Sequence, residues 1–285
     1  MKNNIKVLVT GATGFIGQYV IRYLLKIPGV EVIGTTRNIN KAKGLDFYNE
    51  IQFVEIDFSN INENIFQKLN EPDILINLAW DGLPNYKELF HIEKNFFENY
   101  KFIKTMIGSG LKNINVTGTC LEYGFVEGSL KETLITNPSN SYAIAKDSLR
   151  KCIDVLSTKY SFSFKWLRLF YMYGIGQSAN SIISQIEQSV ARGDKLFNMS
   201  GGEQLRDYLH VSRVAEYIVK CSLQDKVTGI INCCSGSPIS LRKFVENYIK
   251  ENHYDIELNL GYYPYLDYEP LAFWGENSKL KSIIQ

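Results

Sequence analysis

The sequence predicts an α/β fold in which a doubly wound parallel sheet is joined to a smaller C-terminal lobe. In the first half of the 285 residues, short apolar runs alternate with longer amphipathic stretches. This alternation is typical of β-α-β units and a parallel sheet. The second half loses the regularity and ends in an aromatic stretch, LGYYPYLDYEPLAFWG. Such a change fits a sheet domain capped by a lobe.

The predicted elements follow one another as such a fold requires. IKVLVT at residues 5–10 is the first strand, and FIGQYVIRYLL at 15–25 has the apolar period of a helix. Further strands are expected at 30–36, 51–56, 73–79, 113–118, 164–174 and 230–234. Further helices are expected at 91–110, 141–150 and 181–193.

We expect one compact body with no flexible linker. Residues 1–172, with 205–234 returning to them, are predicted to form the sheet domain, and 173–204 and 235–285 the lobe. The aromatic tail suits either a lid that faces a ligand or a solvated packing surface.

Composition excludes several classes of protein. The formal net charge is +1 without a long run of one sign, which argues against a nucleic-acid or membrane-surface partner. No apolar run approaches the about 18 residues of a membrane span. The N-terminus MKNNIKVLVTGATG enters the first strand directly, without a signal peptide. The five cysteines form no C-x-x-C pair. We expect a cytoplasmic protein without a metal site.

The segment VLVTGATGFIG carries the first functional signal. It places Gly11, Gly14 and Gly17 between the first strand and the first helix. Glycines at these positions allow a tight turn and the close approach of a pyrophosphate, whose charge the helix N-terminus favours. The segment therefore predicts a dinucleotide site, the alternative being an ordinary tight turn.

The end of the second strand bears on which dinucleotide is bound. NAD-binding sites usually carry an acid here for the adenosine ribose. This chain has Thr36 and Arg37, with Lys41 one helical turn beyond. Because an arginine can bind a 2′-phosphate through two hydrogen bonds, NADP(H) is favoured over NAD(H). A solvated loop arginine is the alternative.

The segment SYAIAKDSLR spaces Tyr142 and Lys146 four residues apart in a predicted helix. Residues at i and i+4 lie on one helix face, so the phenol and the ammonium can approach a common point. An ammonium beside a phenol favours phenolate and eases movement of its proton. The pair is a candidate for proton transfer, although a surface helix can carry the same spacing without function.

With the glycine loop and this pair both present, the chain resembles the extended short-chain dehydrogenase/reductase family. Within it, the chain is most similar to nucleotide-sugar epimerases, dehydratases and 4-keto reductases. The matching motifs run from Lys6 to about Lys281 and include NLAW, VTGTCLEYG, LRLFYMYG and LRDYLHVSRVAEYI. The resemblance implies a Rossmann sheet. It also implies a homodimer formed through the helix at 95–106 and the helix that bears Tyr142.

The resemblance, together with the glycine loop and Arg37, gives the candidate site residues. The catalytic group is Thr119, Tyr142 and Lys146. The cofactor-binding group is Gly11, Thr13, Gly14, Phe15, Ile16, Gly17, Arg37, Asn38, Asp57, Phe58, Leu78, Ala79, Trp80, Asn95, Tyr142, Lys146 and Phe170. The substrate-binding group is Asp81, Thr119, Cys120, Leu121, Tyr171 and Arg206.

The family chemistry gives each catalytic residue a role. Tyr142 is expected to exchange a proton with the sugar oxygen while hydride moves between the sugar carbon and the nicotinamide. Lys146 is expected to hold the nicotinamide ribose and tune the tyrosine. Thr119, found by counting back from Gly124, is expected to hydrogen-bond the carbonyl.

Departures from the family pattern narrow the reaction. Family dehydratases carry an Asp-Glu pair directly after the catalytic Ser/Thr, where this chain has Cys120 and Leu121. Glu122 is expected to face away if the segment is extended. Dehydratase activity is therefore rejected. Asp207 and His210 are expected to brace their segment rather than act in catalysis. Other departures are Tyr171, Ile175 and Arg213.

The leading hypothesis is an NADPH-dependent reductase of a nucleotide-linked 4-keto-6-deoxy sugar, in bacterial surface glycan precursor synthesis. One alternative is a nucleotide-sugar 4-epimerase with tightly bound NAD. Another is a non-catalytic NADP-binding regulator on the same fold. The sequence does not predict the sugar or its nucleotide.

Overall fold

The central sheet has seven parallel strands in the order β12-β7-β5-β4-β1-β2-β3. The structure, a computed structural model, describes residues 4–265 and 270–285. The strands are β1 Ile5–Thr10, β2 Val30–Thr36, β3 Gln52–Glu55, β4 Ile74–Asn77, β5 Asn113–Thr119, β7 Ser163–Leu169 and β12 Gly229–Cys233. Because β2 and β3 extend the sheet on one side of β1 and the later strands on the other, the predicted doubly wound Rossmann sheet is confirmed.

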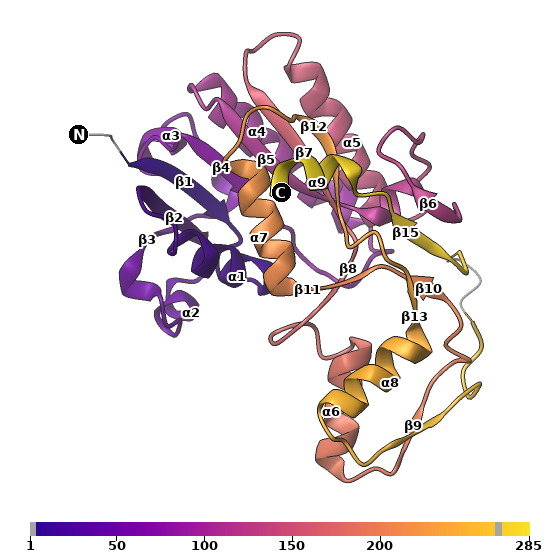
Figure 1. The fold of residues 1–285 in the computed structure, drawn as a ribbon. Coiled ribbons are helices and arrows are strands. Elements are labelled where there is room, and N and C mark those ends of the chain that lie inside the picture. The colour runs from indigo at the N-terminus through magenta and orange to yellow at the C-terminus, as the bar shows by residue number, and fades with distance from the viewer. Residues whose placement is uncertain (1–3, 266–269) are drawn as a thin grey trace.

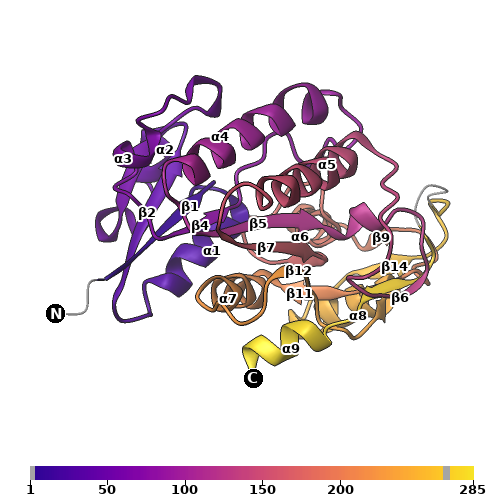
Figure 2. The same ribbon diagram turned by 90° about the horizontal axis from the view of Figure 1, so that it is seen from above.

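Helices cover both faces of this sheet (Figure 1; Figure 2). One face carries α4 Phe97–Gly108 and α5 Ser141–Leu156, and the other carries α1 Phe15–Leu24, α7 Val211–Ser222 and α9 Ser278–Ile284. Side chains alternate along β1: Val7 and Val9 pack in the cluster that contains α1 and α7, whereas Leu8 packs with α4 and α5. This two-residue period divides the core into two layers.

A smaller lobe lies apart from the sheet (Figure 1). It consists of α6 Ile182–Arg192, β9 Leu196–Asn198, α8 Leu241–Glu251 and β14 Glu257–Asn259. Ile186, Phe197 and Val245 join these elements in a separate apolar cluster. The exact boundaries of the two predicted domains stay a prediction. Residues 266–269, part of the predicted aromatic lid, lie outside the described residues.

Short paired strands connect the lobe to the sheet. The pairs are β8 Tyr171–Tyr173 with β11 Tyr208–His210, β10 Leu205–Arg206 with β13 Ile239–Ser240, and β6 Gly128–Leu130 with β15 Phe273–Gly275. The remaining short helices and turns are α2 Ile39–Lys43, α3 Ile65–Lys68, η1 Tyr48–Glu50, η2 Phe58–Asn60 and η4 Cys120–Tyr123.

Two predicted elements differ from the structure. The predicted strand at 164–174 is two strands, because the chain leaves the sheet at Phe170 and β8 pairs with β11 instead. The predicted helix at 91–110 begins as a π-helix, η3 His91–Phe96, before α4 continues it. π-Helical turns widen a helix locally and occur often at functional sites.

Candidate active site

The glycine loop forms the tight connection that the sequence predicts. Gly11 has a φ of +67°, and a Cβ built on it would lie 3.1 Å from the Ala79 backbone nitrogen. A Cβ on Gly17 would overlap the Gly11 carbonyl oxygen. Helix α1 begins after Gly14, so its first N–H groups face the loop. No side chain caps this end of the helix. The loop can accept a pyrophosphate at close range.

A cavity of about 220 Å³ opens beside this loop. The predicted cofactor residues that line it are Gly11, Thr13, Gly14, Arg37, Asp57, Phe58, Leu78, Ala79, Trp80 and Asn95. The rest of the predicted cofactor group lies outside its lining: Phe15, Ile16, Gly17, Asn38, Tyr142, Lys146 and Phe170. Asn38 caps α2 instead, because its side-chain oxygen accepts hydrogen bonds from the backbone of Asn40 and Lys41.

Arg37 has a partner that the sequence analysis did not foresee. Its guanidinium forms an ion pair with Asp81. Both residues line the cavity beside the glycine loop, which we call the cofactor cavity. The structure therefore places Asp81, which the sequence analysis assigned to the substrate, in the lining of this cavity. Glu98 lines the same cavity. An anionic group entering next to Arg37 would meet these carboxylates.

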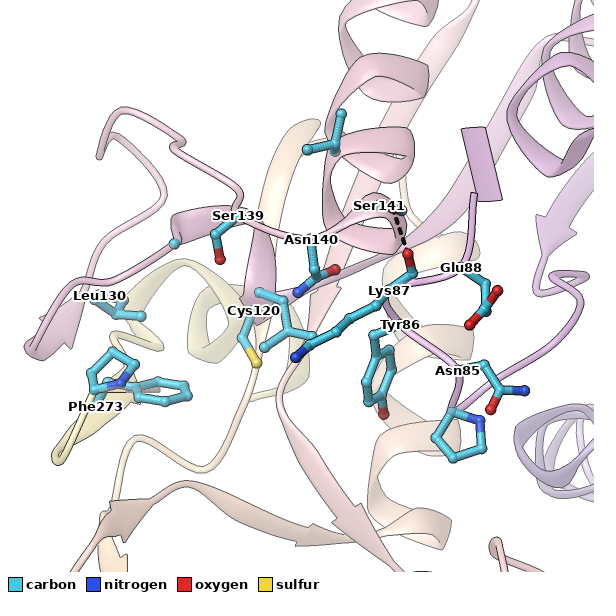
Figure 3. Close-up of a pocket in the computed structure, with 15 residues that line it drawn as sticks. Asn85, Tyr86, Lys87, Glu88, Cys120, Leu130, Ser139, Asn140, Ser141 and Phe273 are labelled. Atoms are coloured by element: carbon cyan, nitrogen blue, oxygen red, sulfur yellow. Dashed lines mark hydrogen bonds between the residues drawn. The ribbon is translucent and has the colours of Figure 1, made fainter. Parts of the chain in front are cut away.

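A second cavity, of about 520 Å³, lies beside the N-terminus of α5 (Figure 3). Cys120 and Leu121, two of the predicted substrate-binding residues, line it. Most of its wall comes from segments that the sequence analysis did not single out: 84–88, 139–141, Leu130, Ile144, Pro270 and Phe273. Tyr86 and Lys87 extend from the 84–88 segment into this space (Figure 3).

Tyr142 stands between the two cavities. Its ring centroid lies 5.9 Å from that of Trp80, which lines the cofactor cavity, and 5.4 Å from that of Tyr86, which lines the second cavity. The Lys146 ammonium donates to the Thr117 carbonyl oxygen at 2.9 Å. It also lies 4.0 Å from the centroid of the Trp80 ring. The predicted pair thus contacts wall residues of both cavities.

Burial controls the protonation of this pair. It raises the pKa of Tyr142 above its ordinary value, although a hydrogen bond with the Thr119 side chain acts in the opposite direction. Burial also lowers the pKa of Lys146 to about 7. The phenolate-favouring effect expected from the sequence is therefore outweighed, and at neutral pH Tyr142 is a neutral phenol with a proton to donate.

Thr119 ends β5 and begins the short turn η4. Its backbone N–H donates to the Glu122 carboxylate at 2.8 Å, and its hydroxyl accepts from the Leu121 N–H at 3.3 Å. Because the segment is a turn rather than extended, Glu122 is fully buried beneath Thr119. There it also accepts from Arg168 at 2.7 Å and from Trp166. Glu122 is a supporting residue that the sequence analysis assigned no role.

The remaining predicted residues lie around β10 and β11. Arg206 donates to the Leu271 carbonyl oxygen at 3.2 Å and stacks 4.5 Å from the ring centroid of Phe273. It lies behind the second cavity, outside its lining. Phe170 is buried in a cluster with Cys120 and Phe273, with Tyr171 packed against it.

Asp207 and His210 make structural contacts. The Asp207 carboxylate accepts from the backbone N–H groups of Ser235 and Gly236 at 2.7 and 2.9 Å. His210 caps α7 by accepting from the Ser212 N–H.

Over the part of the chain that the structure describes, no helix is both long and apolar enough to cross a membrane. Within residues 4–265 and 270–285, His, Cys, Asp and Glu also form no group of three or more placed to hold a metal ion.

Comparison with known proteins assigns the family. The model of the NAD dependent epimerase/dehydratase family matches residues 7–234. A dTDP-6-deoxy-L-talose 4-dehydrogenase (NAD(+)) from Aggregatibacter actinomycetemcomitans is 31% identical over 274 residues, which covers 94% of this chain and 98% of that protein. A GDP-6-deoxy-D-talose 4-dehydrogenase from the same organism is 24% identical over 238 residues, covering 81% of this chain and 74% of that protein.

Solved structures share the fold. The UDP-glucuronic acid 4-epimerase from Bacillus cereus, in complex with UDP-glucuronic acid and NAD, superposes with a TM-score of 0.84 at 20% identity, covering 99% of this chain and 93% of that chain. The matched family model spans the glycine loop, the tyrosine–lysine pair and all of the central sheet except the first two residues of β1. The chain therefore belongs to the NAD-dependent epimerase/dehydratase family, a nicotinamide-dependent branch of the extended short-chain dehydrogenases/reductases.

Proposed function

We propose that this protein acts on a nucleotide sugar, transferring hydride at C4 of a nucleotide-linked 6-deoxy hexose between the 4-keto and 4-hydroxy forms with NAD(H). The observation that carries the proposal is the position of Tyr142 between wall residues of two cavities, one beside a glycine loop and a larger one of about 520 Å³. Both similar dehydrogenases act, by their names, at C4 of a 6-deoxytalose carried on a nucleotide.

The cofactor side supports NAD(H) in place of the NADP(H) that Arg37 suggested. Since the charge of Arg37 is balanced by Asp81, it is less available to a 2′-phosphate. Asp57 and Glu98 add negative charge to the same cavity. The dTDP-6-deoxy-L-talose dehydrogenase is also described as NAD(+)-dependent.

The glycine loop fits a dinucleotide, because side chains at Gly11 or Gly17 would clash with the neighbouring backbone and open the tight turn on which a pyrophosphate binds. The bound nicotinamide would supply or accept the hydride. Tyr142 would give its phenolic proton to the C4 oxygen during reduction and take it back during oxidation. Thr119 would hydrogen-bond the same oxygen, and Lys146 would hold the nicotinamide ribose.

The lining of the second cavity supports hydride transfer without loss of water. Cys120 and Leu121 stand where family dehydratases carry their acid and base, and both line this cavity. Leucine has no proton to exchange, and a cysteine alone does not replace the acid–base pair. The proposal therefore contains no elimination step.

The test is a turnover assay that follows NADH and NADPH at 340 nm (the wavelength of reduced nicotinamide absorption). The substrates are 4-keto-6-deoxy hexoses carried on dTDP and GDP, and the reverse reaction uses dTDP-6-deoxy-L-talose with NAD⁺. We expect NADH oxidation on the dTDP-linked substrate. Tightly bound NAD with no net NADH consumption would support a 4-epimerase instead. NADH binding without turnover of any nucleotide sugar would support a regulator.

A first prediction uses Tyr142→Phe in this assay. The substitution removes one oxygen and keeps the ring contacts with Trp80 and Tyr86. NADH affinity should be nearly unchanged, while turnover should fall by about 10²–10⁴-fold, the effect of losing a positioned acid. Near-normal turnover by this variant would show that another group moves the proton.

A further inference from the structure

His91 is a fully buried imidazole that belongs to none of the predicted site residues. Its Nδ1 accepts the indole N–H of Trp80 at 3.0 Å, and its Nε2 lies 3.0 Å from the carbonyl oxygen of Asn85. An indole N–H only donates and a carbonyl oxygen only accepts. The two partners therefore fix a neutral imidazole with its proton on Nε2. Burial lowers the pKa of His91, which favours the same neutral form.

The two partners of His91 belong to different cavities. Trp80 lines the cofactor cavity, and its ring lies against the Lys146 ammonium. Asn85 lines the second cavity. A single imidazole thus joins a wall residue of one cavity to a wall residue of the other.

The segment around Asn85 is held by its backbone carbonyl groups. The Asn85 oxygen is bound by His91, the Tyr86 oxygen accepts the backbone N–H of Tyr142 at 3.0 Å, and the Lys87 oxygen accepts the Ser141 hydroxyl at 2.9 Å. Two of these three contacts come from the first residues of α5, and Figure 3 shows the one between Ser141 and Lys87. His91 supplies the third, and it is the contact that leads to Trp80 and Lys146.

Asn95 also holds the His91 ring in place. The Asn95 side-chain amide lies 3.3 Å from Nδ1 and donates to the Asp81 carbonyl oxygen at 3.0 Å. Asn95 belongs to the same π-helical turn, which brings both side chains toward the cofactor cavity. The imidazole therefore has little freedom to turn away from either partner.

We propose that His91 is a positioning residue with two separate contacts, one that sets Trp80 against Lys146 and one that sets the 84–88 segment against the sugar. The sugar side of this proposal rests on the proposed function. The cofactor side does not, since it concerns only contacts among Trp80, His91 and Lys146.

Two substitutions separate the two hydrogen bonds. In His91→Asn, the amide oxygen can replace Nδ1 as the acceptor for Trp80, but nothing replaces Nε2. In His91→Gln, the longer side chain places an amide N–H near Nε2, so the bond to Asn85 is kept and the acceptor for Trp80 is lost. His253→Gln, at an exposed position, is the matched control.

We expect His91→Gln to weaken NADH binding about fivefold in calorimetry and to leave the KM for the sugar nearly unchanged. His91→Asn should raise the KM for the sugar about fivefold and leave NADH affinity nearly unchanged. Equal effects of both variants on both ligands, or no effect of either, would overturn the proposal, because a residue that only fills the core does not distinguish the two sides.

A measurement without any ligand tests the Trp80 contact directly. The indole N–H resonance of Trp80, assigned with Trp80→Phe, should move upfield and exchange faster in His91→Gln but not in His91→Asn.

A double-mutant cycle with NADH tests the same contact by binding. His91→Gln should add nothing to the NADH-binding loss caused by Trp80→Phe. Additive losses would show that His91 does not act on NADH binding through Trp80, even if the histidine variants were unstable.

The outcome distinguishes this proposal from the proposed function. If the parent protein turns over no nucleotide sugar, the proposed function fails, while NADH binding and the indole resonance still decide whether His91 positions Trp80. If turnover is present but the two variants behave alike, only the role of His91 is wrong.

Discussion

The phenol of Tyr142 is surrounded by the rings of Trp80, Tyr86 and His91, which keep water from it. From the sequence, the neighbouring ammonium is expected to favour phenolate. In the structure the pKa of Tyr142 is raised instead, because burial disfavours the phenolate more than the surroundings favour it. A short motif identifies the two residues, but their protonation depends on side chains from distant segments.

Lys146 should make stability depend on pH. Burial lowers its pKa to about 7 from the ordinary lysine value of 10.5. Between these values the unfolded chain binds a proton that the folded chain lacks, so the free energy of unfolding rises with pH in this window. The destabilisation by the buried charge is fully present below about pH 7. The Trp80 ring opposes part of it by favouring the charged form.

We predict that Lys146→Met is more stable than the parent at pH 6.5, and that this margin shrinks by about 2 kcal/mol at pH 9. Urea unfolding at both values measures it. Lys159→Met, at an exposed position, is the control and should show no such change. A margin independent of pH would mean that Lys146 keeps its proton in the folded state throughout this range.

Asp81 should discriminate between the two dinucleotides. Its ion pair with Arg37 closes one side of the cofactor cavity. Asp81→Asn would free the guanidinium and remove a negative charge next to it. We predict that the ratio of kcat/KM for NADPH to that for NADH rises about tenfold, the equivalent of about 1.4 kcal/mol. Glu63→Gln, an exposed charge change elsewhere, should leave the ratio unaltered. An unchanged ratio in Asp81→Asn would show that Asp81 does not determine which dinucleotide is preferred.

At the scale of elements, the sequence predicts those strands and helices whose apolar period is visible within the element itself. The strands at 5–10 and 30–36 match β1 and β2, and the glycine loop follows β1 as expected. The break at Phe170 is not visible locally, because β8 continues the apolar pattern but finds its partner in β11, far along the chain. The turn η4 is likewise set by Glu122, whose partners lie on β7.

Glu122 should therefore matter more for stability than its place in the motif suggests. It is fully buried and forms an ion pair with the equally buried Arg168. We predict that Glu122→Gln lowers the free energy of unfolding by about 3–5 kcal/mol, since a buried charge is left without its partner. Glu63→Gln serves again as the exposed control. A loss below about 1 kcal/mol, the size of an ordinary hydrogen bond, would show that the pair is not needed to hold β5 and β7 together.

At the scale of the whole molecule, the site is built from both ends of the chain. The second cavity combines 84–88, 139–141 and Phe273, which the fold brings together and no sequence window contains. Family motifs identify Cys120 and Leu121 there because they adjoin the catalytic strand end. The loop residues carry no such motif, which is why the sequence analysis does not find them.

The predicted homodimer also belongs to this scale. α4 and α5 lie side by side on the outer layer of the sheet (Figure 2). On their outward sides Phe97 is 58% exposed and Val155 61% exposed, so an apolar surface is available to a second copy. Lys101, Lys104 and Lys151 are also exposed on these helices, and Lys151 forms an ion pair with Asp147.

We predict that the parent protein elutes at twice the 32.6 kDa chain mass in size-exclusion chromatography with light scattering. A double variant, Phe97→Glu with Val155→Glu, should be monomeric, because dimerisation would bury two uncompensated charges from each chain. Leu196→Glu is the matched control, since it adds a charge at a residue 58% exposed on the smaller lobe, away from α4 and α5. A parent that is monomeric at micromolar concentration would rule out this dimer. A dimer that persists in the double variant but is lost in Leu196→Glu would move the interface to the smaller lobe.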